Sequence, residues 1–312
     1  MKSHEQNESN QAGCLLAVHA HPDDETLTNA ALLATSARQR HVVVVTCTRG
    51  EQGEVIPANL EHLTEQKSVL AKYRSGELRS ALVALGVREH YFLDEIPGTH
   101  LPVQQDSGMG WVADRFAVQA SAPKVFPPGA LCSGDLAQQA QTLAKLIVEL
   151  KPTTVVTYDP NGGYGHPDHV RAHQITVQAL RVVAGSAPEV FAQIRLYWTI
   201  ILPEELIAAR AELAVYVQNN PEPFASLVLP QADLPAAANT GLAANYTVSL
   251  APVIEQVLLA LKAYPSQIQG VVEVAGKNLL GAYALSNKVL VPLLKAERYA
   301  RIDLQQIISA AE

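Results

Sequence analysis

The strongest constraint on the fold is a pair of short apolar runs separated by one helix-length segment. Residues 14–18 and 41–47 are rich in Leu, Ala and Val, and the β-branched content of the second run disfavours a helix. Between them, residues 25–39 carry apolar side chains at helical spacing. Strand, helix and strand in this order predict a βαβ unit with parallel strands. Because such strands are apolar throughout, both of their faces should be buried.

The same alternation continues along the chain. Helices are predicted over 64–85 with a stop at Gly86, over 135–150, and over 167–183 with proline in the first turn. Further strands are predicted at 91–93, 153–158 and 194–201. The sequence therefore predicts an α/β fold, with a Rossmann-like, mostly parallel sheet and helices on both faces.

Two polar clusters follow strands of the predicted sheet. His21-Pro22-Asp23-Asp24-Glu25 comes directly after the first strand, and Gly165-His166-Pro167-Asp168-His169 lies a few residues after the strand at 153–158. Ligands of open parallel sheets bind at the carboxyl ends of the strands, so we expect both clusters in one site. Imidazoles and carboxylates suit zinc and similar ions, and catalytic zinc sites use three protein ligands with one position left for water.

These clusters suggest distinct roles for their side chains. His21, Asp24 and His169 form a suitable set of three metal ligands, and Asp23 is placed to take a proton from the attacking water. His173, four residues after His169, is an alternative ligand because it could share the same helix face.

Simpler explanations account for parts of the clusters. An acidic run before a helix also serves as an N-cap with acidic first-turn residues, but this does not explain His21 or the near copy of the tetrad at His166. His19 is expected to be packed or to support a ligand. A structural zinc site would close with four ligands, mostly cysteine, and no cysteine lies in either cluster. A Rossmann-like sugar-binding module without turnover remains a non-enzymatic alternative.

The two clusters taken together resemble those of the LmbE-like, or PIG-L, family of zinc-dependent N-acetylglucosaminyl deacetylases. Three further stretches resemble the branch of this family that acts in mycothiol biosynthesis: Thr48–Glu54, Asp106–Met109 and Asn161–Tyr164. That branch hydrolyses the acetamide of 1D-myo-inositol 2-acetamido-2-deoxy-alpha-D-glucopyranoside and releases acetate and glucosaminyl-inositol. The resemblance thus implies a metal-dependent N-deacetylase, a hydrolase of a linear amide bond.

For the metal, the resemblance implies one zinc ion per subunit on His21, Asp24 and His169, with Asp23 as the general base. Iron(II) or another divalent ion would also suit imidazole and carboxylate ligands. The sequence alone does not choose between these metals.

For the acetamide, the resemblance implies that Tyr164 and His166 polarise the carbonyl and stabilise the oxyanion. It implies that Asp168 orients His166. We expect the leaving amine to be protonated by a His166 cation held by Asp168, or by Asp23 as it returns its proton.

For the rest of the substrate, Arg74, Asp106 and Met109 resemble the positions that hold the inositol. Gln105 stands where this pattern has arginine, which changes part of the predicted inositol-binding wall. The related mycothiol S-conjugate amidases have a lysine shortly after the first cluster and a proline where this chain has Gly165. Here Thr26–Asn29 contains no lysine, which favours the deacetylase.

Composition narrows the class of partner. The net charge is -7 and there is no Lys/Arg-rich run, which argues against nucleic acid or an anionic membrane and favours a small-molecule N-acetylated amino sugar. The apolar residues lie in short runs, so no transmembrane span is expected. Three widely spaced cysteines suit a reducing compartment, and we expect a cytoplasmic protein.

The sequence predicts three parts. Residues 1–13 are polar and lack a signal-peptide core, so they are expected to be a flexible tail. Residues 14–202 are expected to form the Rossmann-like catalytic domain, and 203–312 a smaller C-terminal α/β region that completes the substrate site. The stretch 94–134 is rich in Gly, Pro and Ser, and a loop of that length is typical of a binding wall or lid.

Overall fold

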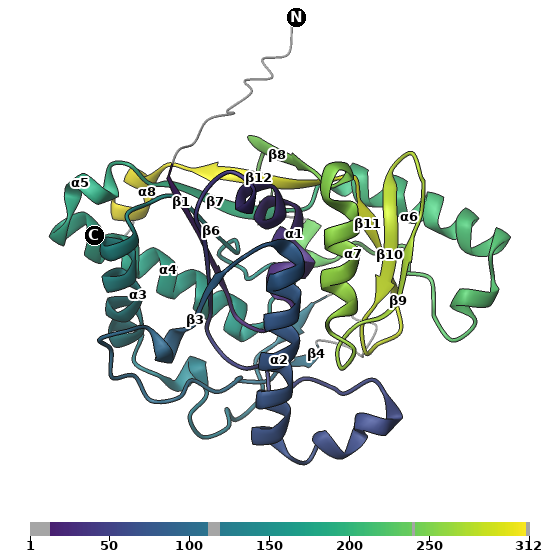
Figure 1. The fold of residues 1–312 in the computed structure, drawn as a ribbon, viewed down its shortest axis with the longest axis horizontal. Coiled ribbons are helices and arrows are strands. Elements are labelled where there is room, and N and C mark those ends of the chain that lie inside the picture. The colour runs from purple at the N-terminus through teal and green to yellow at the C-terminus, as the bar shows by residue number, and fades with distance from the viewer. Residues whose placement is uncertain (1–12, 112–118, 239–240, 310–312) are drawn as a thin grey trace, which may run out of the picture.

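A seven-stranded sheet forms the centre of the protein, in the order β3-β2-β1-β6-β7-β12-β8 (Figure 1). The structure is a computed structural model that describes residues 13–111, 119–238 and 241–309. The predicted tail lies, except for Gly13, outside the described residues. Five strands are parallel: β1 (Cys14–His19), β2 (Val42–Thr46), β3 (Glu89–Phe92), β6 (Pro152–Thr157) and β7 (Arg195–Ile200).

Helices cover both faces of this sheet, as predicted (Figure 1). One face carries α1 (Asp24–Ala37), α2 (Lys67–Leu85) and α7 (Ile254–Lys262), and the other carries α3 (Leu136–Leu150), α4 (Pro167–Ser186) and α5 (Pro188–Phe191). Leu15 of β1 packs into the first core and Leu16 into the second. Because both faces of β1 are buried, its sequence is apolar throughout and does not alternate.

Local signals in the sequence explain where the helices begin and end. Gly86 ends α2 in the left-handed conformation, at φ 77°, which costs glycine little. Asp135 caps α3 by accepting the backbone N–H groups of Ala137 and Gln138. The predicted start of the second helix at residue 64 is three residues early: Ala58–Leu63 form a 3-10 helix, η1, and α2 begins at Lys67 after its N-cap Gln66.

The region after residue 202 contains strands that the sequence pattern did not predict. β12 (Ala296–Ile302) pairs antiparallel with β7, and β8 (Tyr246–Ser249) pairs antiparallel with β12, so both extend the central sheet. A second, antiparallel sheet packs against α6 (Pro203–Asn219) and comprises β9 (Gln269–Glu273), β10 (Leu279–Ala284) and β11 (Leu290–Leu294). Gly281 and Pro292 interrupt the strand pattern of this segment, which weakens its signal.

The remaining elements are short. They are β4 (Gly110–Trp111), β5 (Ala120–Ser121), α8 (Leu304–Ser309), and the 3-10 helices η2 (Leu93–Glu95), η3 (Leu131–Ser133), η4 (Glu222–Phe224), η5 (Ala236–Ala238) and η6 (Ala251–Val253). The predicted boundary after residue 202 falls between β7 and α6, and its status as a domain boundary stays a prediction. Among the described residues, no helix is long and apolar enough to cross a membrane.

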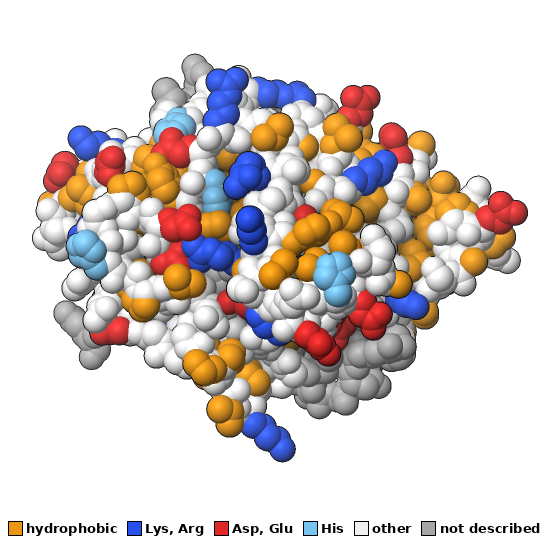
Figure 2. Space-filling model, turned by 60° about the horizontal axis from the view of Figure 1, so that its bottom comes forward, with side chains coloured by type: hydrophobic (Ala, Val, Ile, Leu, Met, Phe, Trp, Pro, Cys, Tyr) orange, Lys and Arg blue, Asp and Glu red, His pale blue; other side chains and the backbone are white. Residues whose placement is uncertain are grey.

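One face of the molecule illustrates how the charge is distributed. In Figure 2, Lys and Arg side chains alternate with Asp and Glu side chains and with apolar ones. On this face the described residues therefore form a surface of mixed sign.

Candidate metal centre

The two polar clusters meet at one edge of the parallel sheet, as predicted. The first cluster connects β1 to α1, which begins at Asp24, and the second leads into α4, for which His166 is the N-cap. β1 and β6 are neighbours in the sheet, so the segments that follow them lie side by side. A Cβ on Gly162, whose φ is 65°, would come within 2.6 Å of the Val170 backbone nitrogen, so the turn before α4 requires glycine there.

Asp24 lies between the two predicted histidine ligands. Its Oδ2 is 3.2 Å from His21 Nδ1, and its Oδ1 is 3.2 Å from His169 Nε2. All three side chains are buried. Burial works to raise the pKa of Asp24, but the imidazoles of His169 and His21 outweigh it and hold that pKa well below its ordinary value. An ionised carboxylate thus faces two ring nitrogens.

Hydrogen bonds to the far side of each ring determine which nitrogen is available to a metal. His169 Nδ1 lies 3.2 Å from the Gly162 carbonyl oxygen, which only accepts, so we assign the proton to Nδ1. His21 Nε2 lies 3.2 Å from Asp168 Oδ2, which leaves Nδ1 toward Asp24. His169 Nε2 is buried and has no hydrogen-bond partner among the described residues. The lone pairs of His169 Nε2 and Asp24 Oδ1, which face one another at 3.2 Å, fit a bound cation.

The ionisation of His21 is consistent with such a cation. Burial works to lower the pKa of His21, but the carboxylates of Asp106, Asp168 and Asp24 outweigh it and raise the pKa well above its ordinary value. The ring therefore holds a second proton, and a positive charge, when no metal is bound, and metal binding would release that proton.

Two other sets of side chains come close enough to share a cation: His21 with His166 and His169, and His21 with Asp106 and Asp168. In these sets the remaining groups already have partners. Asp106 accepts the backbone N–H groups of Gln52 and Gly108, and Asp168 accepts that of Ser107. Asp24 Oδ2 likewise accepts the His21 backbone N–H at 2.8 Å, but its Oδ1 faces His169 Nε2, which has no hydrogen-bond partner among the described residues, and this contact favours the predicted set.

His166 departs from its predicted ionised state. Its Nδ1 accepts the backbone N–H of Asp168 at 3.1 Å, which places the proton of the neutral ring on Nε2. Burial, followed by the imidazoles of His21 and His169, holds the pKa of His166 well below its ordinary value. His166 is thus a neutral donor at neutral pH, and the expectation of a cation held by Asp168 is corrected.

The Asp168 carboxylate makes contacts other than the predicted one to His166. Besides His21 Nε2, it accepts hydrogen bonds from the Ser107 backbone N–H at 2.8 Å and from Cys132 Sγ at 3.2 Å. A carboxylate on the far nitrogen of a histidine ligand orients the ring and raises its basicity. Asp168 therefore supports a candidate metal ligand directly.

Asp23 occupies a strained backbone position beside this centre. Its φ of 111° lies outside the regions that L-residues ordinarily adopt, and such strain gathers at functional sites. Burial raises the pKa of its carboxyl to about 8, and the Arg74 guanidinium opposes this shift. Arg74 Nη2 lies 2.9 Å from Asp23 Oδ2.

The three residues predicted to hold the inositol do not lie in the same surroundings. Asp106 is buried, with its Oδ1 3.7 Å from His21 Nε2, and Met109 is half-buried in the same loop. Arg74 is only 3% exposed and donates to the carbonyl oxygens of Gly50 and Pro22. Tyr164 is half-buried, with its ring edge-on to that of His169.

Two tyrosines support the centre without having been predicted. Tyr158, just past β6, accepts the Ala20 backbone N–H at 2.9 Å and stacks on His169 with ring centroids 4.3 Å apart. Its place at a strand end was a usable signal. Tyr264 donates to Glu25 Oε1 at 2.6 Å across 239 residues of chain, which no local pattern reveals.

The remaining histidines near the clusters have packing contacts. His173 Nδ1 lies 2.9 Å from the Tyr158 carbonyl oxygen, and its ring packs edge-on against Trp198. His19 is buried against Tyr158, and burial lowers its pKa to about 4. These contacts account for the His173 ring without a metal, whereas both ring nitrogens of His19 are buried and have no hydrogen-bond partner among the described residues.

The long loop at 94–134 reaches the centre at several points. Ser107 and Cys132 contact Asp168, and the Ala120 backbone N–H donates to the Tyr164 carbonyl at 2.8 Å. Arg49 anchors the start of the loop through Asp94 at 2.8 Å. The predicted covering of a sugar by this loop stays a prediction.

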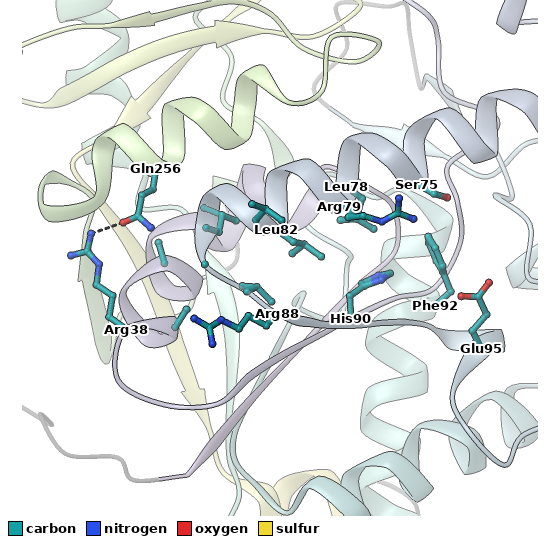
Figure 3. Close-up of a pocket in the computed structure, with 16 residues that line it drawn as sticks. Arg38, Ser75, Leu78, Arg79, Leu82, Arg88, His90, Phe92, Glu95 and Gln256 are labelled. Atoms are coloured by element: carbon teal, nitrogen blue, oxygen red, sulfur yellow. Dashed lines mark hydrogen bonds between the residues drawn. The ribbon is translucent and has the colours of Figure 1, made fainter.

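A groove of about 870 Å³ lies elsewhere on the surface, between α2, the end of α1 and the edge strand β3 (Figure 3). None of the predicted site residues lines it. Arg38 and Arg88, which do, follow the C-terminal ends of α1 and α2, where cations are favourable. Their charge therefore has a structural explanation.

Comparisons with known proteins show which family this chain resembles. The profile of the PIG-L family, described as GlcNAc-PI de-N-acetylase, matches residues 16–180. A 1D-myo-inositol 2-acetamido-2-deoxy-alpha-D-glucopyranoside deacetylase 1 of Saccharopolyspora erythraea is 39% identical over 91% of this chain and 88% of its own length. The deacetylase of the same name, without the number, from Actinosynnema mirum is also 39% identical, over 91% and 90%. Among solved structures, N,N'-diacetylchitobiose deacetylase from Pyrococcus horikoshii aligns at 18% identity and a TM-score of 0.47, covering 84% of this chain and 73% of that one.

Proposed function

This chain belongs to the PIG-L family of de-N-acetylases, and from that premise we propose that it hydrolyses the acetamide of 1D-myo-inositol 2-acetamido-2-deoxy-alpha-D-glucopyranoside. The products would be acetate and glucosaminyl-inositol, as in mycothiol biosynthesis. Similarity to relatives of that name over nine-tenths of the chain supports this substrate. The observation that carries the reaction type is the Asp24 carboxylate between ring nitrogens of His21 and His169.

We propose zinc as the ion, held by His21, Asp24 and His169. Two imidazoles and one carboxylate are a donor set that zinc accepts, and three protein ligands leave a position open. When bound, a divalent ion of this kind lowers the pKa of water and polarises a carbonyl. The buried, partnerless Nε2 of His169 supports this assignment.

Asp23 is our candidate general base. One of its oxygens is held by Arg74 at 2.9 Å, which leaves the other free to take a proton from the attacking water. The positive charge of Arg74 favours the ionised carboxylate that this role requires.

His166 and Tyr164 are our candidate donors to the acetamide oxygen. Because His166 Nδ1 accepts a backbone N–H, its Nε2–H is available to stabilise the oxygen as negative charge develops. A neutral His166 is a weak source of a proton for the leaving amine, so Asp23, having taken a proton, becomes the first candidate acid.

For the remainder of the substrate we propose Asp106 and Met109, with the loop at 94–134 as a wall. Residues 203–312 would complete the site, since Tyr264 bonds Glu25 and the Ser266 backbone N–H bonds Glu77 at 2.8 Å. A mycothiol S-conjugate amidase remains the second candidate, weakened by the missing lysine in Thr26–Asn29.

A side-by-side assay tests the function. Purified protein of known metal content would be given N-acetylglucosaminyl-inositol, N-acetylglucosamine and a mycothiol conjugate, with and without a chelator. We expect acetate release to be fastest from the first compound and to stop on chelation. Faster cleavage of the conjugate would identify an amidase, and binding of the sugar without acetate release would identify a binding module.

A further inference from the structure

We infer that Arg74 is a positioning residue for Asp23, and that it does not hold the inositol as the resemblance implied. This inference rests on the proposed function, because it assigns Asp23 the task of taking a proton from water. The Arg74 guanidinium is buried inside the site and is bonded to the protein itself.

The donors of Arg74 point at the loops that carry the site. Nη2 lies 2.5 Å from the Pro22 carbonyl oxygen and 2.9 Å from Asp23 Oδ2, and Nη1 donates to the Gly50 carbonyl oxygen. Arg74 Nε is buried and has no hydrogen-bond partner among the described residues, and only 3% of the residue is exposed, so the contacts of the fork are made by its two Nη atoms to the protein. One planar group thus joins the loop after β1 to the loop after β2.

The glycines of the loop after β2 make room for this guanidinium. A Cβ on Gly50, whose φ is 66°, would overlap Arg74 Nη1, and one on Gly53 would lie 2.9 Å from the same atom. Backbone can approach Arg74 this closely only where no side chain intervenes. Arg74 therefore explains the glycine at position 50, while a Cβ on Gly53 would come closer still, to 2.6 Å, to Gln267 Oε1.

Asp23 is held from two sides. Its backbone N–H donates to Glu25 Oε2 at 3.1 Å, and Glu25 Oε1 is held in turn by the Tyr264 hydroxyl. Its carboxylate is held by Arg74. A backbone at φ 111° persists only where its surroundings hold it, so removing Arg74 should let the Asp23 carboxylate leave its place.

Kinetics on two substrates separate the two roles. If Arg74 positions Asp23, Arg74→Ala should lower kcat about a hundredfold on both N-acetylglucosaminyl-inositol and N-acetylglucosamine, with KM little changed. If Arg74 holds inositol, the loss should appear in KM and only on the first substrate. Zinc content should match the wild type. Arg79→Ala is the matched control, because it removes an exposed arginine from the same helix.

A conservative variant and rescue of activity by added guanidinium provide two further tests of the role of Arg74. Arg74→Lys keeps the charge without the fork, so we expect a loss of about tenfold on both substrates. Millimolar guanidinium should restore part of the kcat of Arg74→Ala, whereas sodium chloride at the same concentration should not. If Arg74→Ala does not fold, Arg74→Lys alone is compared on the two substrates. Equal losses on N-acetylglucosaminyl-inositol and N-acetylglucosamine support the positioning role. A loss confined to the inositol substrate overturns the inference.

A crystal structure gives a readout that needs no turnover. In zinc-loaded Arg74→Lys and Arg74→Ala without substrate, we expect the Asp23 carboxylate to shift in both, and further in the alanine variant. An unmoved Asp23 in both variants would overturn the inference. Failure of the wild type on every acetamide would overturn the proposed function but leave this structural test valid.

Discussion

Two buried polar networks touch α1, and they differ in how their acceptors are satisfied. Near the middle of the helix, Glu297 of β12 accepts the Ala31 N–H at 2.7 Å, the Leu32 N–H at 2.9 Å and the Tyr299 hydroxyl at 2.6 Å. Asn29 Nδ2 donates to the same hydroxyl at 3.0 Å. Every acceptor of Glu297 thus has a protein donor.

At the start of α1 the acceptors are only partly satisfied: Asp24 Oδ2 accepts the His21 backbone N–H at 2.8 Å, but Asp24 Oδ1 faces a ring nitrogen. The Asp24 carboxylate faces a lone pair of His169 Nε2 at 3.2 Å, and that nitrogen has no hydrogen-bond partner in the described part of the chain. Buried polar groups are normally satisfied, so a network completed by the protein is structural, while one that leaves acceptors facing acceptors indicates a ligand. The comparison therefore assigns Glu297 to stability and Asp24 to function.

Removing a metal ligand should give the largest effect. We expect His169→Ala to abolish metal binding and to reduce acetate release below detection, because two protein ligands remain of three. Inductively coupled plasma analysis and the acetate assay would measure this. His173→Ala is the matched control one turn along α4 and should keep its metal. Metal retention in His169→Ala with loss in His173→Ala would reverse the assignment.

Removing the general base should separate chemistry from metal binding. Asp23→Ala should retain the metal and lower kcat by about 10²- to 10⁴-fold, the range typical of a lost acid–base group. Metal analysis and steady-state kinetics on the same preparation test both halves. Full loss of metal from this variant would contradict the division between Asp23 and Asp24.

Breaking the satisfied network should cost stability and leave the metal in place. Glu297→Ala strands two backbone N–H groups and a hydroxyl, so we expect the free energy of unfolding to fall by roughly 3 kcal/mol. Urea unfolding followed by circular dichroism would measure it, with the exposed Glu273→Ala as control. Loss of metal at temperatures where Glu297→Ala is folded would show that the two networks are not separate.

Changing the support of His21 should have a smaller effect. Asp168→Asn removes the charge opposite His21 Nε2, and losing such a partner typically weakens metal affinity about 10- to 100-fold. Competition with a chromophoric chelator would measure the affinity. An unchanged affinity would assign Asp168 to packing alone.

The pH dependence of stability should show the smallest effect. Burial raises the pKa of Glu297 from its ordinary 4.5 to about 7. Between these values the folded protein binds more protons than the unfolded chain, so this contribution to stability is present at low pH and is lost as pH rises toward 7. We expect a slope on the order of 1 kcal/mol per pH unit that is absent from Glu297→Gln. Equal slopes in the two proteins would contradict it.

Much of the fold and the outline of the site could be predicted from local sequence. The apolar runs of β1 and β2, the stop at Gly86 and the N-terminal proline of α4 are signals carried by a few neighbouring residues. The two clusters could be placed together because carboxyl ends of neighbouring parallel strands share one edge. Two of the strands after residue 202, β10 and β11, escaped prediction because Gly281 and Pro292 interrupt them.

The sequence by itself determined which residue types reach the carboxyl edge of the sheet, because periodicity and capping act over a few residues. Only the tertiary structure decided their partners: the Asp168 carboxylate bonds His21 while the His166 ring meets only the Asp168 backbone N–H, and Arg74 bonds Asp23. A long side chain or a carboxylate can reach several partners, and the distant segments packed around it select one. Partner choice is therefore a property of the assembled fold.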